Sequence, residues 1–289
     1  MKTININKVK DAIISALKED IGTGDITSNS LISPTTYCRA KIIFKEAAMI
    51  CGLNTIKLVY SYLDRCIAVG LLIKDGKRVR KNTTVATLTG PMRGILAGER
   101  VALNIIQRLS GIATLTNRFV DAVSNYNVKI LDTRKTTPGL RELEKYAVRC
   151  GGGVNHRMGL YDAILIKGNH IKCYNTSLAE LERKIKKLIN RRQKTFVEIE
   201  ATSISEAIRF SRLPVNAIML DNMIPSDIRK AVKIIRRKSG RNITLEASGG
   251  ITPKNIRAVA KTGVDRISIG AITHSAKAID VSLEVSDIY

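Results

Sequence analysis

The chain has 289 residues, enough for two domains or one large barrel, and 44% of them are hydrophobic with no tryptophan. It carries 48 lysines and arginines against 25 aspartates and glutamates, a net charge of +23. No apolar stretch approaches the roughly twenty residues of a membrane span, the longest candidate being 67–73. The composition excludes a membrane-spanning protein and predicts an aliphatic core. The charge favours anionic partners, although a solvated basic surface would also explain it.

The N-terminal part of the chain predicts a mixture of helices and strands. An amphipathic helix with Val9, Ile13 and Leu17 on one face ends near Asp20, and its acidic residues distinguish it from a signal peptide. The next expected elements are a strand at 40–47, a helix at 53–63, strands at 67–74 and 84–88, and helices at 95–109 and 113–123.

After Tyr126, short apolar strands alternate with amphipathic helices. Strands are expected at 128–131, 163–166, 196–199, 217–220, 243–245 and 266–269, and helices at 178–190, 204–210, 225–236 and 253–261. Repeated βα units imply a parallel sheet, and continuous apolar strands imply burial on both faces. The sequence therefore predicts an α/β fold.

Polar or glycine residues stand at the end of every strand in this second part. They are Asp132 and Arg134, Lys167 and Asn169, Glu200, Asp221 and Asn222, Glu246 and Ser248, and Gly270. In an α/β barrel the carboxyl ends of the strands converge on one mouth, where active sites are built. The pattern predicts an active site at this mouth.

Five cations lie close together between residues 132 and 170: Arg134, Lys135, His156, Arg157 and Lys167. Cations held near one another repel, and this cost is explained if anions bind among them. We therefore expect a small substrate with several negative charges.

A phosphate site is expected after the last two strands. Ser248, Gly249 and Gly250 precede a helix opened by Thr252 as N-cap and Pro253 in its first turn, and Gly270 follows the next strand. Glycines allow backbone N–H groups to approach a phosphate closely. A glycine pair usually forms only a turn, but glycines at the ends of two successive strands favour a phosphate-binding site.

Glu200 and Asp221 follow neighbouring strands, so both carboxylates can face the same mouth. Such carboxylates suit Mg²⁺ or sugar hydroxyls. The alternative is that they form ion pairs with Arg134 or Lys167. A polar stripe of Arg100, Asn104 and Arg108 is either a solvated helix face or a means of presenting Arg100 to an active site.

The five cysteines, Cys38, Cys51, Cys66, Cys150 and Cys173, form no C-x-x-C pair and have no histidine at zinc spacing. Scattered cysteines of odd number are typical of reduced thiols in a cytoplasmic protein.

Long ordered motifs resemble those of the quinolinate phosphoribosyltransferase family, also called nicotinate-nucleotide pyrophosphorylase (carboxylating). The matching segments are 19–27, 98–114, 132–141, 144–148, 151–153, 156–157, 165–167, 219–222, 247–251 and 268–271. They span nearly the whole chain. Gly168 departs from the family pattern, which usually has an acidic residue between the equivalents of Lys167 and Asn169.

The resemblance implies an N-terminal α/β sandwich domain, residues 1–108, and a C-terminal open α/β barrel of TIM-like type, residues 109–289, with 276–289 expected to pack back on the first domain. It implies phosphoribosyl transfer from phosphoribosyl pyrophosphate to quinolinate with decarboxylation, giving nicotinate mononucleotide, pyrophosphate and CO₂ in NAD biosynthesis. It also implies a cytoplasmic homodimer with shared active sites, which can assemble into hexamers.

The resemblance assigns roles residue by residue. Arg134, His156, Arg157 and Lys167 would surround the quinolinate carboxylates, with Arg100 reaching them from the partner subunit. Lys135, Glu200, Asp221, Ser248, Gly249, Gly250 and Gly270 would bind the phosphoribosyl group and its phosphates, and Lys135, Lys167, Glu200 and Asp221 would be catalytic. Mg²⁺ would be held mainly through the substrate, with Glu200 and Asp221 as candidate ligands. We expect His156 to donate a hydrogen bond rather than shuttle a proton.

Two alternatives remain. One is a related phosphoribosyltransferase that uses another carboxylated heterocycle, although a cluster of Arg100, Arg134, Arg157 and Lys167 favours a dicarboxylate. The other is a nucleic-acid-binding protein, suggested by the basic segment 183–194. The scarcity of aromatic residues and the absence of a binding motif argue against it, so we expect no nucleic-acid partner.

Overall fold

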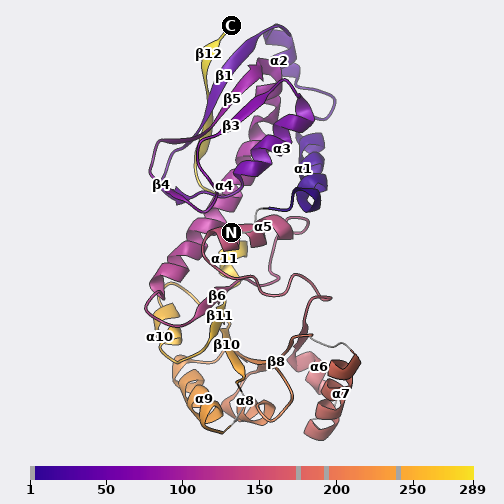
Figure 1. Ribbon diagram of the computed structural model, residues 1–289, viewed down its shortest axis with the longest axis vertical. Coiled ribbons are helices and arrows are strands. Elements are labelled where there is room, and N and C mark those ends of the chain that lie inside the picture. Colours follow the sequence, from indigo (N-terminus) through magenta and orange to yellow (C-terminus); the bar gives the residue numbers. More distant parts are fainter. Residues whose placement is uncertain (1–3, 174–176, 192–194, 239–241) are drawn as a thin grey trace. The chain divides into compact units, whose positions relative to one another are not determined.

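The computed structural model describes residues 4–173, 177–191, 195–238 and 242–289 (Figure 1). It contains two compact units. The sandwich unit comprises Met1–Asn117, Lys135–Gly153 and Ile272–Tyr289, and the barrel unit comprises Arg118–Arg134 and Val154–Ala271. No helix in these described ranges has both the length and the apolar character needed to cross a membrane.

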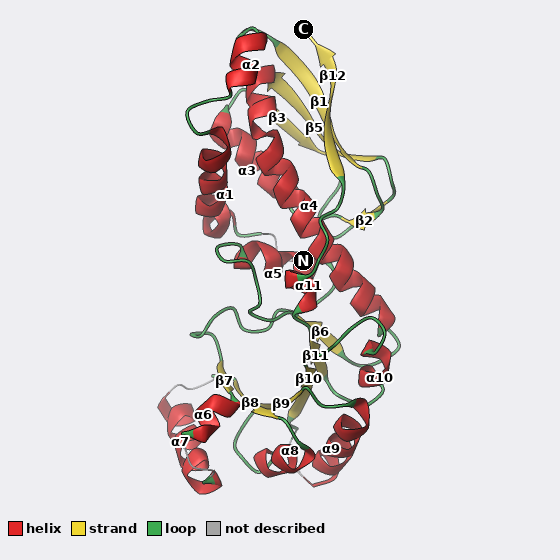
Figure 2. Ribbon diagram, turned by 180° about the vertical axis from the view of Figure 1, so that it is seen from behind, coloured by secondary structure: helices red, strands yellow, loops and turns green. Residues whose placement is uncertain are grey.

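The sandwich unit is built on an antiparallel sheet with strand order β12-β1-β5-β3. Its strands are β1 (Tyr37–Phe44), β3 (Ala68–Leu71), β5 (Thr83–Pro91) and β12 (Val281–Ile288), and β2 (Ala48–Met49) pairs with β4 (Arg78–Val79). Cys38, Ala40, Ile42 and Phe44 of β1 are buried, in the alternation of a strand with one face on the core. Figure 2 shows helices gathered on one side of this sheet.

The helices of this unit are α1 (Ile6–Ile21), α2 (Ile26–Leu31), α3 (Leu53–Leu63), α4 (Met92–Ala122, which continues into the barrel unit), α5 (Arg141–Cys150) and α11 (Ala271–His274). α1 buries Val9, Ile13 and Leu17 as the sequence predicts, and α3 has the predicted bounds. α2, α5 and β12 were not predicted. β1 begins and ends three residues before the expected strand 40–47, because its residues from Cys38 to Phe44 pair with both β5 and β12.

The barrel unit contains a six-stranded parallel sheet with the order β6-β11-β10-β9-β8-β7. The strands are β6 (Lys129–Leu131), β7 (Ile164–Ile166), β8 (Val197–Ala201), β9 (Ala217–Asp221), β10 (Thr244–Ser248) and β11 (Arg266–Ser268). The first strand pairs with the last, while β6 and β7 do not pair within the described residues. The sheet is therefore an open α/β barrel, as expected.

The remaining helices are α6 (Gly168–Lys172), α7 (Leu178–Arg191), α8 (Ile204–Phe210), α9 (Pro225–Lys238) and α10 (Ile256–Ala260). α10 is shorter than the predicted helix 253–261. The side chain of Asn255 accepts the N–H of Thr252 and donates to the carbonyl of Gly250, which closes a separate turn before the helix. The prediction of Thr252 as N-cap and Pro253 in the first turn was wrong. Arg192 and Lys194 of the basic segment lie outside the described residues.

The prediction of separate helices at 95–109 and 113–123 was also wrong, because α4 is continuous through Gly111. This glycine serves packing instead of ending a helix: a Cβ placed on it would lie 2.0 Å from the carbonyl oxygen of Lys277. The expected domain boundary between residues 108 and 109 falls inside the same helix, and Lys135–Gly153 joins the sandwich unit.

Gly111→Ala is therefore expected to destabilise the protein by about 1–3 kcal/mol, although alanine is the better helix former. The matched control is Gly168→Ala, where an added Cβ would meet nothing within 4 Å and the change should stay within about 0.5 kcal/mol. Urea unfolding of both variants measures the difference. Equal stability would show that the backbone at 277 moves away without cost.

Candidate active site

Strand register separates the two faces of the parallel sheet. Glu200 pairs with Met219, which pairs with Glu246, and Asp221 pairs with Ser248, which pairs with Ser268. Since registered neighbours in parallel strands point to the same side, these polar side chains share one face. The alternate residues are aliphatic and buried: Val197, Ile199, Ile218, Leu220, Leu245, Ala247 and Ile267. The polar face is therefore the interior of the barrel, and the aliphatic face lies beneath the outer helices.

Asp132 fixes the segment that carries His156. It is completely buried just after β6, and its carboxylate accepts the backbone N–H of His156 at 2.9 Å and the side-chain amide of Asn155 at 2.5 Å. Val154, the residue before them, forms a parallel bridge with Leu131. These contacts hold the segment from 154 to 156 along the edge of β6 that does not pair with β11, where no other strand is present among the described residues.

The imidazole of His156 lies above two buried carboxylates. Its Nε2 is 3.1 Å from Oε2 of Glu198 and 3.6 Å from Oε1 of Glu246. Its Nδ1 accepts the backbone N–H of Arg157 at 2.8 Å. An accepting Nδ1 carries no proton, so the geometry assigns the neutral tautomer with the proton on Nε2, directed at Glu198. In this tautomer the Nε2 donor of His156 faces a protein carboxylate.

Burial and then the nearby carboxylate of Glu198 raise the pKa of Glu246 to about 7, against the opposing effects of His156, Ser268 and Arg266. Two carboxylates placed this close in a dry interior cannot both ionise cheaply. The cluster of His156, Glu198 and Glu246 therefore holds a proton at neutral pH that separate glutamates would release.

Three more of the predicted cations, Arg134, Arg157 and Lys167, belong to the barrel unit. Arg157 donates to the carbonyl of Ala163 at 3.0 Å. Its pKa is lowered by burial and by the charge of Arg134, against the effects of Glu198, Glu200 and Asp162. The two guanidinium groups are therefore near neighbours. Nζ of Lys167, which is half exposed, lies 3.3 Å from Oε1 of Glu200. Of the alternatives for Glu200, the ion pair with Lys167 is present in this structure.

Glu200 and Asp221 lie on the interior face of adjacent strands but in successive rows of the sheet. Asp221 accepts from the side chain of Asn222 at 2.8 Å. Within the described residues, neither belongs to a group of three or more ligands close enough to enclose a metal ion. Their hard oxygen donors suit Mg²⁺, which is commonly held by one or two carboxylates together with substrate phosphates.

The predicted phosphate-binding glycines form a close turn at the end of β10. Gly249 and Gly250 have φ of 86° and 61°, a region that favours glycine. A Cβ on Gly249 would lie 2.1 Å from the side-chain oxygen of Asn222, which itself has φ of 55°. Ser248 and Gly270, at the ends of neighbouring strands, are partly exposed. Because α10 begins only at Ile256, this turn and not a helix N-terminus would contact a phosphate.

Two predicted site residues belong to the sandwich unit. Arg100 on α4 is exposed and lies 3.4 Å from Glu99. Lys135 is exposed, and its carbonyl accepts from the hydroxyl of Thr273. Arg108, from the same stripe as Arg100, donates to the fully buried Glu144 at 2.9 Å and so has a structural role. Gly168 opens α6 in free space, where a larger side chain would fit.

Sequence reasoning placed Asp132 and Glu246 at the barrel mouth without giving them a role and did not single out Glu198, although all three are buried beneath the site. A signal was present: Glu198 and Glu200 alternate with Val197 and Ile199 in an otherwise apolar strand. Burying an unpaired carboxylate in a strand costs free energy, so a glutamate there needs a partner. A glutamate two residues before a predicted site residue points to the same face of the strand, which places it in the same site.

Family models match both parts of the chain, the N-terminal domain of quinolinate phosphoribosyl transferase at residues 25–110 and its C-terminal domain at 112–284. The probable nicotinate-nucleotide pyrophosphorylase [carboxylating] of Bacillus subtilis is 45% identical over 269 residues, covering 93% of this chain and 90% of that protein. Quinolinate phosphoribosyltransferase [decarboxylating] 1 of Nicotiana glauca is 36% identical and covers 96% of this chain and 82% of that protein.

A solved structure of the nicotinate-nucleotide pyrophosphorylase from Francisella tularensis superposes with a TM-score of 0.91 and 43% identity, covering 98% of each chain. The similarity extends along both domains of the chain. The chain belongs to the quinolinate phosphoribosyltransferase family.

Proposed function

We propose that this protein transfers the phosphoribosyl group of phosphoribosyl pyrophosphate to quinolinate and decarboxylates the product, giving nicotinate mononucleotide, pyrophosphate and CO₂. The observation that carries the proposal is the proximity of Arg134 and Arg157, near Glu200, whose carboxylate also contacts Lys167. Two neighbouring guanidinium groups repel each other, and a dicarboxylate bound between them relieves that repulsion. The family relationship supports the same reaction.

Quinolinate would be held by charge-assisted hydrogen bonds from Arg134, Arg157 and Lys167. Binding requires Lys167 to exchange its contact with Glu200 for a substrate carboxylate, which its half-exposed side chain permits. His156 would position this cluster from below, because Nδ1 holds the N–H of Arg157 and Nε2 is directed at Glu198. The interior carboxylates also offset part of the positive charge that these cations bring to the site.

The phosphoribosyl group would lie toward β8, β9 and β10. Ribose hydroxyls fit Glu200 and Asp221, and the 5′-phosphate fits the turn of Ser248, Gly249 and Gly250 with Gly270 nearby. Lys135 is proposed to contact phosphate of the donor. Mg²⁺ would be bound mainly by the pyrophosphate, with Glu200 and Asp221 as candidate ligands, and would offset charge on that leaving group.

The reaction needs no general base for bond formation. The lone pair of the pyridine nitrogen attacks the anomeric carbon as its bond to pyrophosphate breaks, and positive charge develops on the sugar. Carboxylates of Glu200 and Asp221 would stabilise that charge. The alkylated ring nitrogen then accepts electron density as the bond to CO₂ breaks, and a proton replaces the lost carboxylate. Positioning of both substrates supplies much of the remaining acceleration.

Product formation from quinolinate, phosphoribosyl pyrophosphate and Mg²⁺ tests the proposal, with nicotinate as the parallel substrate. We expect nicotinate mononucleotide and CO₂ from quinolinate alone. Turnover of nicotinate without CO₂ would assign the cluster to a monocarboxylate and contradict the proposal. Omission of Mg²⁺ in the presence of a chelator is expected to abolish turnover, and full activity without it would remove the metal from the reaction.

We also propose a homodimer in which Arg100 completes the site of the partner subunit. Arg100→Ala and Lys167→Ala proteins are each expected to be inactive. After co-refolding in equal amounts, half of the dimers would be mixed with one intact site each, so about a quarter of the wild-type activity should return. No recovery in dimers verified as mixed would place both residues in the same subunit's site.

A further inference from the structure

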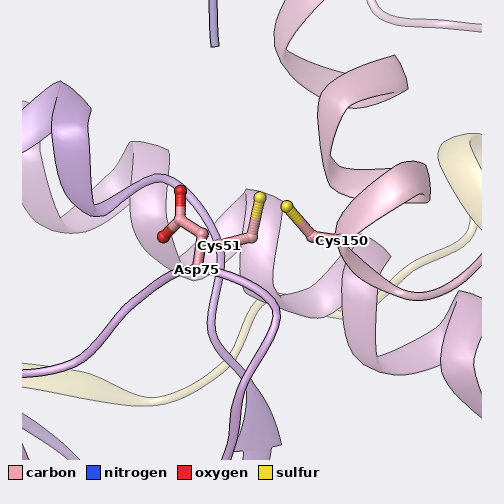
Figure 3. A group of neighbouring side chains, drawn as sticks. All are labelled: Cys51, Asp75 and Cys150. Carbon is pink, nitrogen blue, oxygen red and sulfur yellow. The ribbon is translucent and has the colours of Figure 1, made fainter. Parts of the chain in front are cut away.

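The sandwich unit contains a second cluster of ligand-type side chains, separate from the barrel interior. Cys51, between β2 and α3, is fully buried, as is Cys150 at the end of α5. Asp75, in the turn before β4, completes the group, and one ligand atom from each residue lies within 4.8 Å of the other two. In Figure 3 the two sulfur atoms point toward one another, with the carboxylate of Asp75 beside Cys51.

We propose that Cys51, Asp75 and Cys150 bind one thiophilic divalent cation of the Zn²⁺ class. Two thiolates and a carboxylate drawn from three separate segments are a common ligand set for this ion, and water would occupy the fourth tetrahedral position. Neither thiol has a role in the proposed reaction.

Asp75 is already oriented by other groups, as ligating carboxylates usually are. Its Oδ1 accepts the backbone N–H of Leu53 at 3.0 Å, and its Oδ2 accepts the hydroxyl of Tyr146 at 2.7 Å. A carboxylate offers about four lone pairs, so capacity for a cation remains. The partly exposed Asp75 also gives an ion a route to the buried sulfurs.

The charges around the cluster suit a divalent ion. Burial, the neighbouring Cys150 and the charge of Asp75 raise the pKa of Cys51 well above its usual range, so the Cys51 thiol stays protonated without a metal. Binding would release the two thiol protons to solvent, with no oxidation or reduction. Two thiolates and Asp75 carry three negative charges. The cation neutralises two, and Arg149, which lies over the Tyr146 ring at 5.5 Å, offsets the third.

A bound ion would link the end of α5 to the chain just before α3. Cys150 is followed within six residues by His156, so the ion would anchor the chain just before the segment that carries the active-site histidine. Because a metal binds the folded cluster and not its separated ligands, it should stabilise the protein by linkage.

Cobalt binding to the full, untagged chain tests the site without relying on enzyme activity. The protein is reduced under argon until all five thiols react in denaturant, and Co²⁺ is added. We expect a thiolate-to-cobalt charge-transfer band that saturates at about one ion per chain and disappears when Zn²⁺ is added. Zn²⁺ should also raise the Tm.

The variants identify the ligands. Cys150→Ser should weaken Co²⁺ binding at least tenfold, and Tyr146→Phe, which removes only the hydrogen bond to Asp75, by about tenfold. The matched control is the Cys66→Ser/Cys173→Ser double variant, whose exposed thiols lie outside the cluster and whose binding should equal wild type. Absence of the band in reduced wild-type protein, or its loss in the control, would overturn the proposal. If Cys150→Ser does not fold, unchanged affinity in Tyr146→Phe would count against the site.

Discussion

Arg134→Ala is expected to lower kcat/KM for quinolinate by roughly 30- to 5,000-fold. Removing one partner of a desolvated, hydrogen-bonded charge pair costs about 2–5 kcal/mol, because the remaining charge stays buried and unpaired. Most of the effect should appear as a higher KM for quinolinate, since Arg134 is proposed to hold the substrate in both the ground state and the transition state. The KM for phosphoribosyl pyrophosphate should change much less.

Initial rates at varied quinolinate, with the donor saturating, measure this effect. Arg257→Ala is the matched control, because this arginine lies in the same unit but donates to the carbonyl of Ala122 near the end of α4, outside the barrel interior. Its kinetics should be those of wild type. Arg134→Lys is expected to recover only part of the loss, since an ammonium cannot form the two parallel bonds of a guanidinium. Unchanged kinetics in a folded Arg134→Ala protein would remove Arg134 from the substrate site.

The second large effect is the dependence of the free energy of unfolding on pH that the titration of Glu246 causes. Its pKa is raised to about 7 from an ordinary value of 4.5, so between these values the folded chain binds a proton that the unfolded chain has released. The stabilising contribution of this group is therefore fully present below about pH 4.5 and is lost as pH rises through 7. A shift of this size corresponds to at most about 3 kcal/mol.

Glu246→Gln abolishes this titration. Relative to wild type, the variant is expected to gain up to about 3 kcal/mol in free energy of unfolding between pH 4.5 and pH 8. Urea unfolding of both proteins across this range measures the difference, and comparison with wild type cancels the titrating groups that do not interact with Glu246. Glu182→Gln, on the surface of α7, should show no comparable trend. A constant difference between wild type and Glu246→Gln would mean that Glu246 is already ionised at pH 5.

Local patterns in the sequence predicted much of the molecule. Continuous apolar runs identified all six barrel strands, because strands covered on both faces consist mostly of apolar residues. The polar residues at their ends indicated one mouth, since the strands are parallel. Short-range patterns failed where a distant segment decides the structure. Two helices were predicted at 95–109 and 113–123, yet one helix runs through Gly111, against which the backbone of Lys277 packs. β12 was missed because its partner β1 lies more than two hundred residues earlier.

The sequence by itself determined the family, the α/β class and most of the residues assigned to substrate. Those properties depend on residue type and spacing along the chain. Only the tertiary structure decided how the side chains meet: that Glu198 and Glu246 share the imidazole of His156, that Lys167 contacts Glu200, and that Cys51, Asp75 and Cys150 converge. Contact between side chains that far apart in the chain depends on strand register and packing, and these are set by the whole fold and by no local pattern.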